Sequence, residues 1–157
     1  HFLINENSLT LTDQLVSDVL EEYRNHVPSI SLREGALNFL RVLKEQRCNI
    51  GIITDGRSVT QRNKLSSLGI NKFLDQIVIS EEYGSEKPSL DNFNSFDQNV
   101  PKFYIGDNPR KDFVAPNHLG WTTIMLLDDG NNIHSQDLII AETYQARFTI
   151  ESFTDLI

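Results

Sequence analysis

Helix-like and strand-like segments alternate along this chain of 157 residues, and this alternation constrains its fold more than any other feature. Residues 49–54 read NIGIIT, a run that is typical of a strand buried on both faces. Further strands are expected at residues 76–80, 102–105, 122–127 and 147–150. This order predicts an α/β fold, in which βαβ units with right-handed crossovers build a parallel sheet flanked by helices.

Capping residues and apolar periodicity locate the expected helices. Thr10 or Thr12 can cap a first helix. Its apolar residues fall at helical spacing, at Leu15, Val16, Val19, Leu20 and Tyr23. The segment from Ser31 to Glu34 has the spacing of a capping box, and Ser58 can cap a third helix. Pro88 is expected at the first position of a later helix, where its missing N–H costs nothing.

Composition limits the classes of protein to which the chain can belong. A hydrophobic content of 39% allows one sizeable core, and the net charge of −8 argues against nucleic acid or an anionic membrane as the main partner. The single cysteine, Cys48, rules out an internal disulfide and a cysteine-based zinc cluster. No apolar run approaches the ~18 residues that a membrane span needs. A soluble cytoplasmic protein is expected.

Two carboxylates lie five residues apart where an expected strand gives way to a helix. Within IGDNPRKD, residues 105–112, Gly106 allows a sharp turn and leaves Asp107 at the carboxyl end of the strand, ahead of Asp112. Ligands of open α/β sheets bind at that end, and oxygen ligands suit Mg²⁺. An equally weighted alternative makes Asp107 a helix N-cap and places Asp112 on a solvated helix face.

Two further segments place polar groups at strand ends. Thr54, Asp55 and Gly56 close the first strand, so that a hydroxyl and backbone N–H groups can face an anion. The alternative is an ordinary Asp-Gly turn. In GSEKPS, residues 84–89, Lys87 lies just before a helix and can neutralise phosphate, although most loop lysines are merely solvated. All these groups are expected to converge on one edge of the sheet.

In this order the motifs resemble those of the haloacid dehalogenase (HAD) superfamily of aspartate-nucleophile phosphatases. The run IGIITDGRSVTQRNKLSSLGI from Ile50 resembles the second motif and its helix, GSEKPS the third motif, and YIGDNPRKDFVAPNHLGWTTIML the fourth. The resemblance covers residues 31–157. It implies a three-layer, Rossmann-like, HAD-type parallel sheet flanked by helices, and a Mg²⁺-dependent phosphatase of a small phosphorylated metabolite that works through an aspartyl-phosphate intermediate.

The resemblance also implies a role for each matching residue. Thr54 and Lys87 would be catalytic and would bind the phosphoryl group, and Asp55 and Gly56 would add backbone amides beside it. The metal ligands would be Asp107 and Asp112, which are the first and last carboxylates of the fourth motif. Asp112 would either coordinate Mg²⁺ or orient Lys87 and water.

One motif of the family does not occur among these residues. The D-x-D-x-[TV] sequence, which supplies the nucleophile and the general acid/base on the central strand, is absent from the printed chain. Residues 1–31 resemble the end of a helical cap, and residues 32–157 the α/β core without that first strand. The chain is therefore predicted to start after the nucleophile segment and to be inactive alone, because no carboxylate can form the covalent intermediate.

The absent strand would lie between the strands that end at Thr54 and Asp107. Either these two strands pair directly or an interior edge stays open, and an open edge invites another chain. A homodimer, a further N-terminal segment or a partner that completes the sheet is therefore expected. The interval from Lys87 to Asp107 is short, which predicts a brief helix, and Pro116 is expected to disturb the helix after Asp112.

Other functional classes remain open. A non-catalytic HAD-like module for binding or assembly is the main alternative, whereas the order of the Asp, Thr and Lys residues does not fit a receiver domain. Tyr23 and His26 are candidates for substrate contact, although packing on a helix face is favoured for both.

Overall fold

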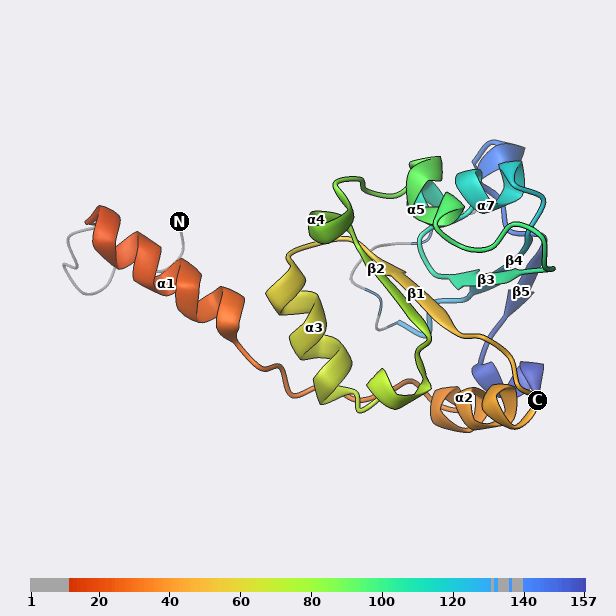
Figure 1. Cartoon of the computed structure of the whole chain (residues 1–157), viewed down its shortest axis with the longest axis horizontal. Helices are drawn as coiled ribbons and strands as arrows, with labels where there is room; N and C mark the ends of the chain where they lie inside the picture. The colour runs from red at the N-terminus through yellow and green to blue at the C-terminus, as the bar shows by residue number, and fades with distance from the viewer. Residues whose placement is uncertain (1–11, 131, 133–135, 137–139) are drawn as a thin grey trace.

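The computed structural model describes residues 12–130, 132, 136 and 140–157 (Figure 1). Its longer helices are α1 (Asp13–Asn25), α2 (Ala36–Glu45) and α3 (Ser58–Ser67). The shorter helices are α4 (Ser80–Tyr83), α5 (Leu90–Asn94), α6 (Pro109–Asp112) and α7 (Val114–His118). Single 3₁₀ turns occur at η1 (Asn71–Phe73), η2 (Glu142–Tyr144) and η3 (Phe153–Leu156). The strands are β1 (Gly51–Thr54), β2 (Gln76–Ile79), β3 (Phe103–Gly106), β4 (Thr122–Leu126) and β5 (Phe148–Ile150).

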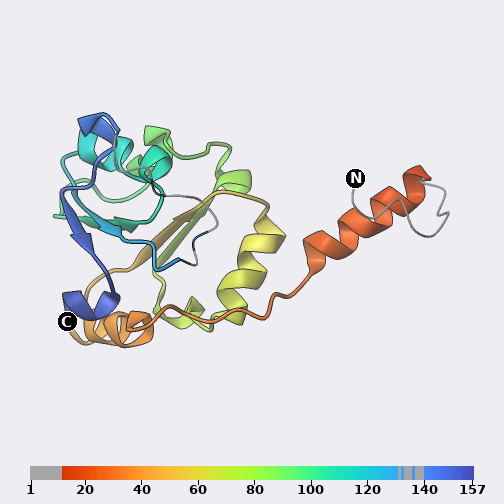
Figure 2. The same cartoon turned by 180° about the vertical axis from the view of Figure 1, so that it is seen from behind.

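All strand pairs are parallel, as the alternating sequence pattern predicts. Ile52 lies opposite Ile77 in the β1–β2 pair, and Ile105 lies opposite Ile124 in the β3–β4 pair. β5 adds to the far side of β4. Helices and 3₁₀ turns surround the strands (Figures 1 and 2), which confirms the α/β class. The strand boundaries differ from the expected ones by one or two residues.

The strands form two separate sheets instead of one. β1 pairs with β2 in the first sheet, and the second has the order β3–β4–β5. Within the described residues, β1 and β3 therefore each keep one unpaired edge. Of the two outcomes expected from the sequence, direct pairing is wrong and the open edge is found. Phe103 at the start of this edge strand β3 is 70% exposed, which is unusual for an aromatic residue of a parallel sheet.

The hydrophobic core of the described residues consists of three small clusters. Leu65, Ile70 and Phe73 form one cluster, which lies against β1 and β2 and against α2. A second cluster lies between α5 and α7 and contains Phe93, Ala115 and Trp121, and a third joins β4 to β5. The second cluster contacts both sheets, through Ile53 of β1 and Tyr104 of β3.

Helix α1 extends away from the α/β core (Figures 1 and 2). Thr12 caps it by accepting a hydrogen bond from the Leu15 N–H at 3.2 Å, whereas Thr10 lies outside the described residues. None of its residues is buried, and Tyr23 is 75% exposed. Its carboxyl end is held by Asn63 of α3, which donates to the carbonyl of Asn25. The apolar side predicted from the sequence is present but uncovered. The assignment of residues 1–31 to a cap stays a prediction.

Three predicted helix details require correction or are explained by the structure. α2 starts at Ala36 after Gly35, which has φ 76° and makes no side-chain cap, so the expected capping box does not form. α5 starts at Leu90 with Ser89 as its cap, so Pro88 precedes the helix instead of occupying its first position. The helix after Asp107 is divided into α6 and α7. Pro116 cannot donate to the carbonyl four residues earlier, which accounts for a break at that point.

None of the helices in the described part of the chain is both long enough and apolar enough to cross a membrane. The cytoplasmic location stays a prediction.

Candidate phosphate and metal site

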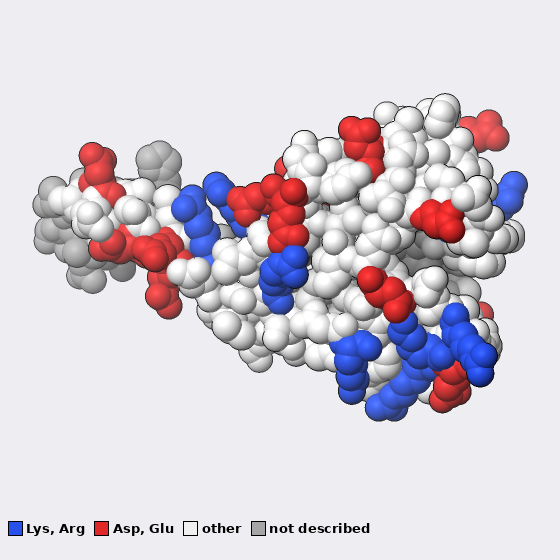
Figure 3. Space-filling view, viewed as in Figure 1, with Lys and Arg blue, Asp and Glu red and all other residues white. Residues whose placement is uncertain are grey.

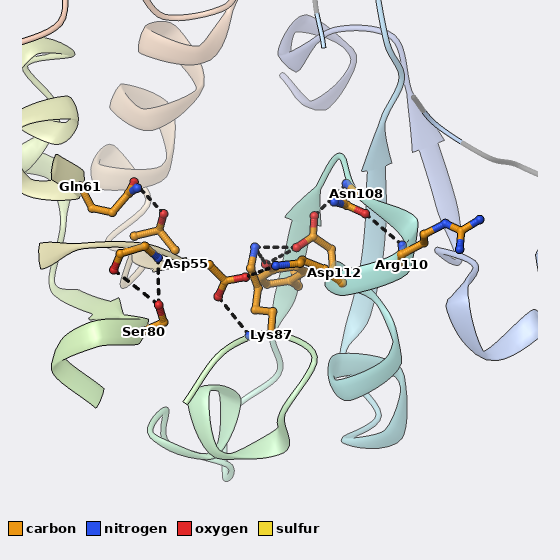
Figure 4. Close-up of polar contacts among 11 residues, drawn as sticks. Asp55, Gln61, Ser80, Lys87, Asn108, Arg110 and Asp112 are labelled. Carbon is orange, nitrogen blue, oxygen red and sulfur yellow. Dashed lines mark hydrogen bonds and ion pairs between the residues drawn. The ribbon is translucent and has the colours of Figure 1, made fainter. Parts of the chain in front are cut away.

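The site lies at the ends of β1 and β3, together with the loops that lead into α3, α5 and α6 (Figure 4). Thr54 is the last residue of β1, and Gly106 is the last residue of β3. Lys87 lies in the loop between α4 and α5. The expected convergence of these groups on one region is therefore found, although β1 and β3 belong to different sheets.

Thr54 is held by a glutamine that the sequence analysis did not identify. The Thr54 hydroxyl donates a hydrogen bond to Oε1 of Gln61 at 3.0 Å. Gln61 lies on α3, one turn after its start, and its amide is also close to Gly56. A Cβ at Gly56 would lie 2.8 Å from Gln61 Nε2, and φ there is +129°, so this position requires glycine.

The loop after β1 is fixed from its other side by α4. The N–H of Gly56 donates to Oγ of the buried Ser80 at 2.8 Å, so this amide is not free to bind phosphate in the present conformation. Glu81 accepts from the Ser58 N–H at 2.7 Å and pairs with Arg57 at 2.9 Å. The hydrogen bond from the Ser58 N–H, followed by the hydrogen bond from Arg57, lowers the pKa of the Glu81 carboxyl below its usual value.

Asp55 uses its side chain as well as its position in the turn. One carboxylate oxygen accepts from the Lys87 backbone N–H at 3.0 Å, and the other lies 3.1 Å from Nζ of Lys111. Asp55 therefore connects the end of β1 to both the loop before α5 and the helix α6. The sequence predicts only a backbone amide at this residue, and no pattern in the sequence points to Lys111.

Lys87 and Asp112 form a buried ion pair at the centre of the site. Lys87 Nζ lies 2.6 Å from Asp112 Oδ1, and the two side chains are 14% and 2% exposed. The Tyr104 hydroxyl donates to the same oxygen at 3.2 Å. Burial, and then the charge of Asp112, raise the pKa of the Tyr104 hydroxyl well above its ordinary value. Tyr104 therefore acts as a neutral donor in this cluster.

The second oxygen of Asp112 binds the turn after β3. It accepts from the N–H groups of Asp107 at 3.1 Å and Asn108 at 2.8 Å. Gly106 is necessary beside it, because a Cβ there would lie 2.6 Å from Asp112 Oδ2. The cap of α6 is Asn108, which accepts from the Arg110 N–H at 3.1 Å. The alternative with Asp107 as N-cap and Asp112 on a solvated face is wrong.

Of the two carboxylates of the fourth motif, only that of Asp107 is available to a hard cation. Asp107 is exposed just after the carboxyl end of β3, and its carboxylate makes no hydrogen bond or ion pair with the described residues. Both oxygens of Asp112 are already taken by N–H, O–H and ammonium donors, so this residue fits the role of orienting Lys87 better than that of a ligand. Within the described residues, no three His, Cys, Asp or Glu side chains group as a ready metal site. Mg²⁺ keeps several waters and commonly uses only one or two protein carboxylates, so the chemistry of Asp107 fits a candidate anchor.

The roles of Thr54, Lys87, Asp107 and Asp112 stay predictions, and the sequence did not indicate the residues that contact them. Ser80 follows the end of β2 and could have been found by the strand-end argument that was applied to Thr54. Tyr104 shares a strand face with Gly106, which is a usable but weak signal. Gln61 and Lys111 carry no signal in a single sequence, because polar residues on short helices are usually solvated.

Comparison with known proteins gives a consistent family. The model of the family described as "Haloacid dehalogenase-like hydrolase" matches residues 3–126. The chain is 36% identical over 93 residues to the glyceraldehyde 3-phosphate phosphatase of Methanocaldococcus jannaschii, covering 56% of this chain and 41% of that protein. It is 29% identical over 157 residues to the ribulose-1,5-bisphosphate 5-phosphatase of Halopiger xanaduensis, covering 96% of this chain and 62% of that protein. The chain thus spans between two fifths and two thirds of these relatives.

Solved structures agree with the fold. A HAD phosphatase from Thermococcus onnurineus superposes with a TM-score of 0.66 at 18% identity, covering 95% of this chain and 63% of that one. The putative HAD-hydrolase YfnB from Bacillus subtilis, solved bound to magnesium, gives a TM-score of 0.61 at 24% identity, covering 80% and 53%. Both likenesses support a HAD-type arrangement of the α/β core.

Proposed function

The chain belongs to the haloacid dehalogenase-like hydrolases, and from that premise we propose that it provides the phosphate and Mg²⁺ side of a phosphatase for a small phosphorylated metabolite. The proposal is supported most strongly by one observation. The ammonium of Lys87 is held by a buried carboxylate, Asp112, whose other oxygen fixes the turn that carries the exposed Asp107. A cation of fixed position beside an accessible carboxylate suits a phosphate monoester together with a divalent metal.

The residues of this chain would share the work by position and charge. Lys87 would offset the negative charge of the phosphoryl oxygens, and the Thr54 hydroxyl would donate to one of them. Asp107 would hold Mg²⁺, which when bound neutralises charge on the phosphate. Asp112 and Tyr104 would keep the Lys87 ammonium in place. The ammonium lies within hydrogen-bond distance of both side chains, and the Tyr104 hydroxyl also donates to Asp112.

Residues 1–157 contain no D-x-D-x-[TV] motif, the motif that would supply the nucleophile. We propose that a strand from a further segment, or from a second chain, supplies it and lies between β1 and β3. The unpaired edges of these two strands within the described residues support that placement. The chain alone would then bind phosphate but not hydrolyse its esters, because no covalent intermediate can form.

The test is the hydrolysis of p-nitrophenyl phosphate by the purified chain, with and without Mg²⁺. We expect no turnover that depends on Mg²⁺ and on Asp107. Clear turnover that disappears in Asp107→Ala would show that the nucleophile is within these residues. The solution mass is measured on the same sample, since a stable monomer would count against a second copy as the source of the strand.

The alternative is a non-catalytic module for binding or assembly. The uncovered apolar side of α1 and the two open strand edges favour it, because each offers a surface to a partner. A D-x-D-x-[TV] motif elsewhere in the complete coding sequence would establish the phosphatase, whereas its absence would favour the module. The substrates named for the relatives differ from one another, so the class of small phosphorylated metabolites is as far as the proposal extends.

A further inference from the structure

The Thr54 hydroxyl has one proton, and in this structure it is directed away from any anion. A hydroxyl donates a single hydrogen bond and accepts through its lone pairs. Thr54 Oγ1 lies 3.0 Å from Gln61 Oε1, an oxygen that only accepts, so the proton lies between these two atoms. In this state Thr54 cannot donate to a phosphoryl oxygen, although the proposed function requires that it does.

The carboxamide of Gln61 is held at this position by its surroundings. Its backbone N–H donates to the Arg57 carbonyl at 2.9 Å in the first turn of α3, which fixes the start of the side chain. Its Nε2 lies against Gly56, where a Cβ would be 2.8 Å away. Figure 4 shows Gln61 pointing from α3 toward the end of β1. The side chain therefore contacts both residues that border the proposed phosphate position on this side.

A carboxamide offers an acceptor at one end and two donors at the other, and a half-turn about its last bond exchanges them. We propose that Gln61 is a positioning residue that sets the direction of the Thr54 hydrogen bond. Without an anion, Oε1 accepts the Thr54 proton. With phosphate bound, the amide turns, Nε2 donates to Thr54, and the hydroxyl proton is released toward the phosphoryl oxygen. This inference rests on the proposed function and adds a residue to it.

Two substitutions of similar length separate this role from simple space filling. Gln61→Glu keeps the acceptor but removes the donor, so it holds the Thr54 proton and cannot support the anion-bound state. Gln61→Met fills the same space and makes neither hydrogen bond. If Gln61 only packs against Gly56, the two variants should behave alike. The carboxylate of Gln61→Glu also repels phosphate directly, and this contribution is measured in the Thr54→Val background, where no hydroxyl remains.

The experiment is a titration of the full chain with inorganic phosphate. The NMR shifts of the backbone amides of Asp55 and Gly56 measure the binding. We expect Gln61→Glu to weaken binding about tenfold or more, the size of one lost hydrogen bond to a charged group, and Gln61→Met less than about threefold. In the Thr54→Val background, Gln61→Glu should weaken binding less than about threefold. Equal effects of Glu and Met, or an undiminished Glu effect in Thr54→Val, would overturn the proposal. Thermal unfolding of each variant reports whether it is folded.

A second readout separates this inference from the proposed function. The side-chain NH₂ resonance of Gln61 is compared in the wild type and in Thr54→Val without phosphate. A shift is expected, because the Thr54–Gln61 hydrogen bond is lost, and no shift would overturn the hydrogen bond itself. A shift here together with no response of the wild type to phosphate would instead contradict the proposed function of the loop, and the anion-bound state with it.

Discussion

Lys87 Nζ lies 2.6 Å from Asp112 Oδ1, and this ion pair joins the loop before α5 to α6, the helix that follows β3. Asp112 is 2% exposed, and its second oxygen accepts from two backbone N–H groups. A carboxylate with so many donors is a rigid support. The position of the Lys87 ammonium therefore depends on the turn that contains Asp107, which links the proposed phosphate and metal groups.

The Lys87→Met variant should lower the free energy of unfolding by about 3 kcal/mol, because it leaves the Asp112 charge buried without its cation. Lys111→Met is the matched control. Lys111 pairs with Asp55 at 3.1 Å but is 44% exposed, so the same substitution should cost less than about 1 kcal/mol. Urea unfolding of both variants measures the difference. Equal losses would show that the Lys87 pair does not have the predicted role.

The Tyr104→Phe variant should change how stability depends on alkaline pH. Burial, and then the charge of Asp112, raise the pKa of Tyr104 in the folded state well above its ordinary value of 10.0, so the fold favours the neutral hydroxyl. This contribution is fully present below pH 10 and is lost as the pH rises further, because only the unfolded chain ionises readily. The wild type should therefore lose stability more steeply above pH 10 than Tyr104→Phe. Parallel pH profiles would contradict the shift.

The Gly106→Ala variant should disrupt the site through a steric clash. The added Cβ would lie 2.6–2.7 Å from three atoms of the Asp112 side chain, so either the carboxylate or the turn after β3 has to move. We expect a loss of about 2–3 kcal/mol, the upper range for overpacking a buried position. Gly120→Ala is the control. Its φ is +73° but nothing lies within 4 Å, so only backbone strain of about 1–2 kcal/mol applies. A smaller loss in Gly106→Ala than in the control would contradict the close approach.

The sequence predicted the residues at the strand ends because strand periodicity determines which residue comes last before a turn. Thr54 and Asp107 were predicted in this way, whereas Lys87 and Asp112 were predicted from their places beside expected helices and from the motif order. The separation into two sheets was left open, since pairing between β1 and β3 depends on what occupies the space between them. The contacts of Gln61 and Tyr104 could not be predicted, because each joins elements whose relative position a single sequence does not give.

The central claim is that Asp107 anchors Mg²⁺ beside a phosphate held by Lys87. The most direct test is the affinity of this chain for inorganic phosphate, measured by the amide resonances of residues 54, 87 and 107, with and without Mg²⁺. Mg²⁺ should strengthen phosphate binding on the order of tenfold in the wild type, because Mg²⁺ sites commonly combine protein carboxylates with phosphate oxygens. It should have no effect in Asp107→Asn. An equal Mg²⁺ effect in Asp107→Asn, or phosphate shifts confined to other parts of the chain, would contradict the account.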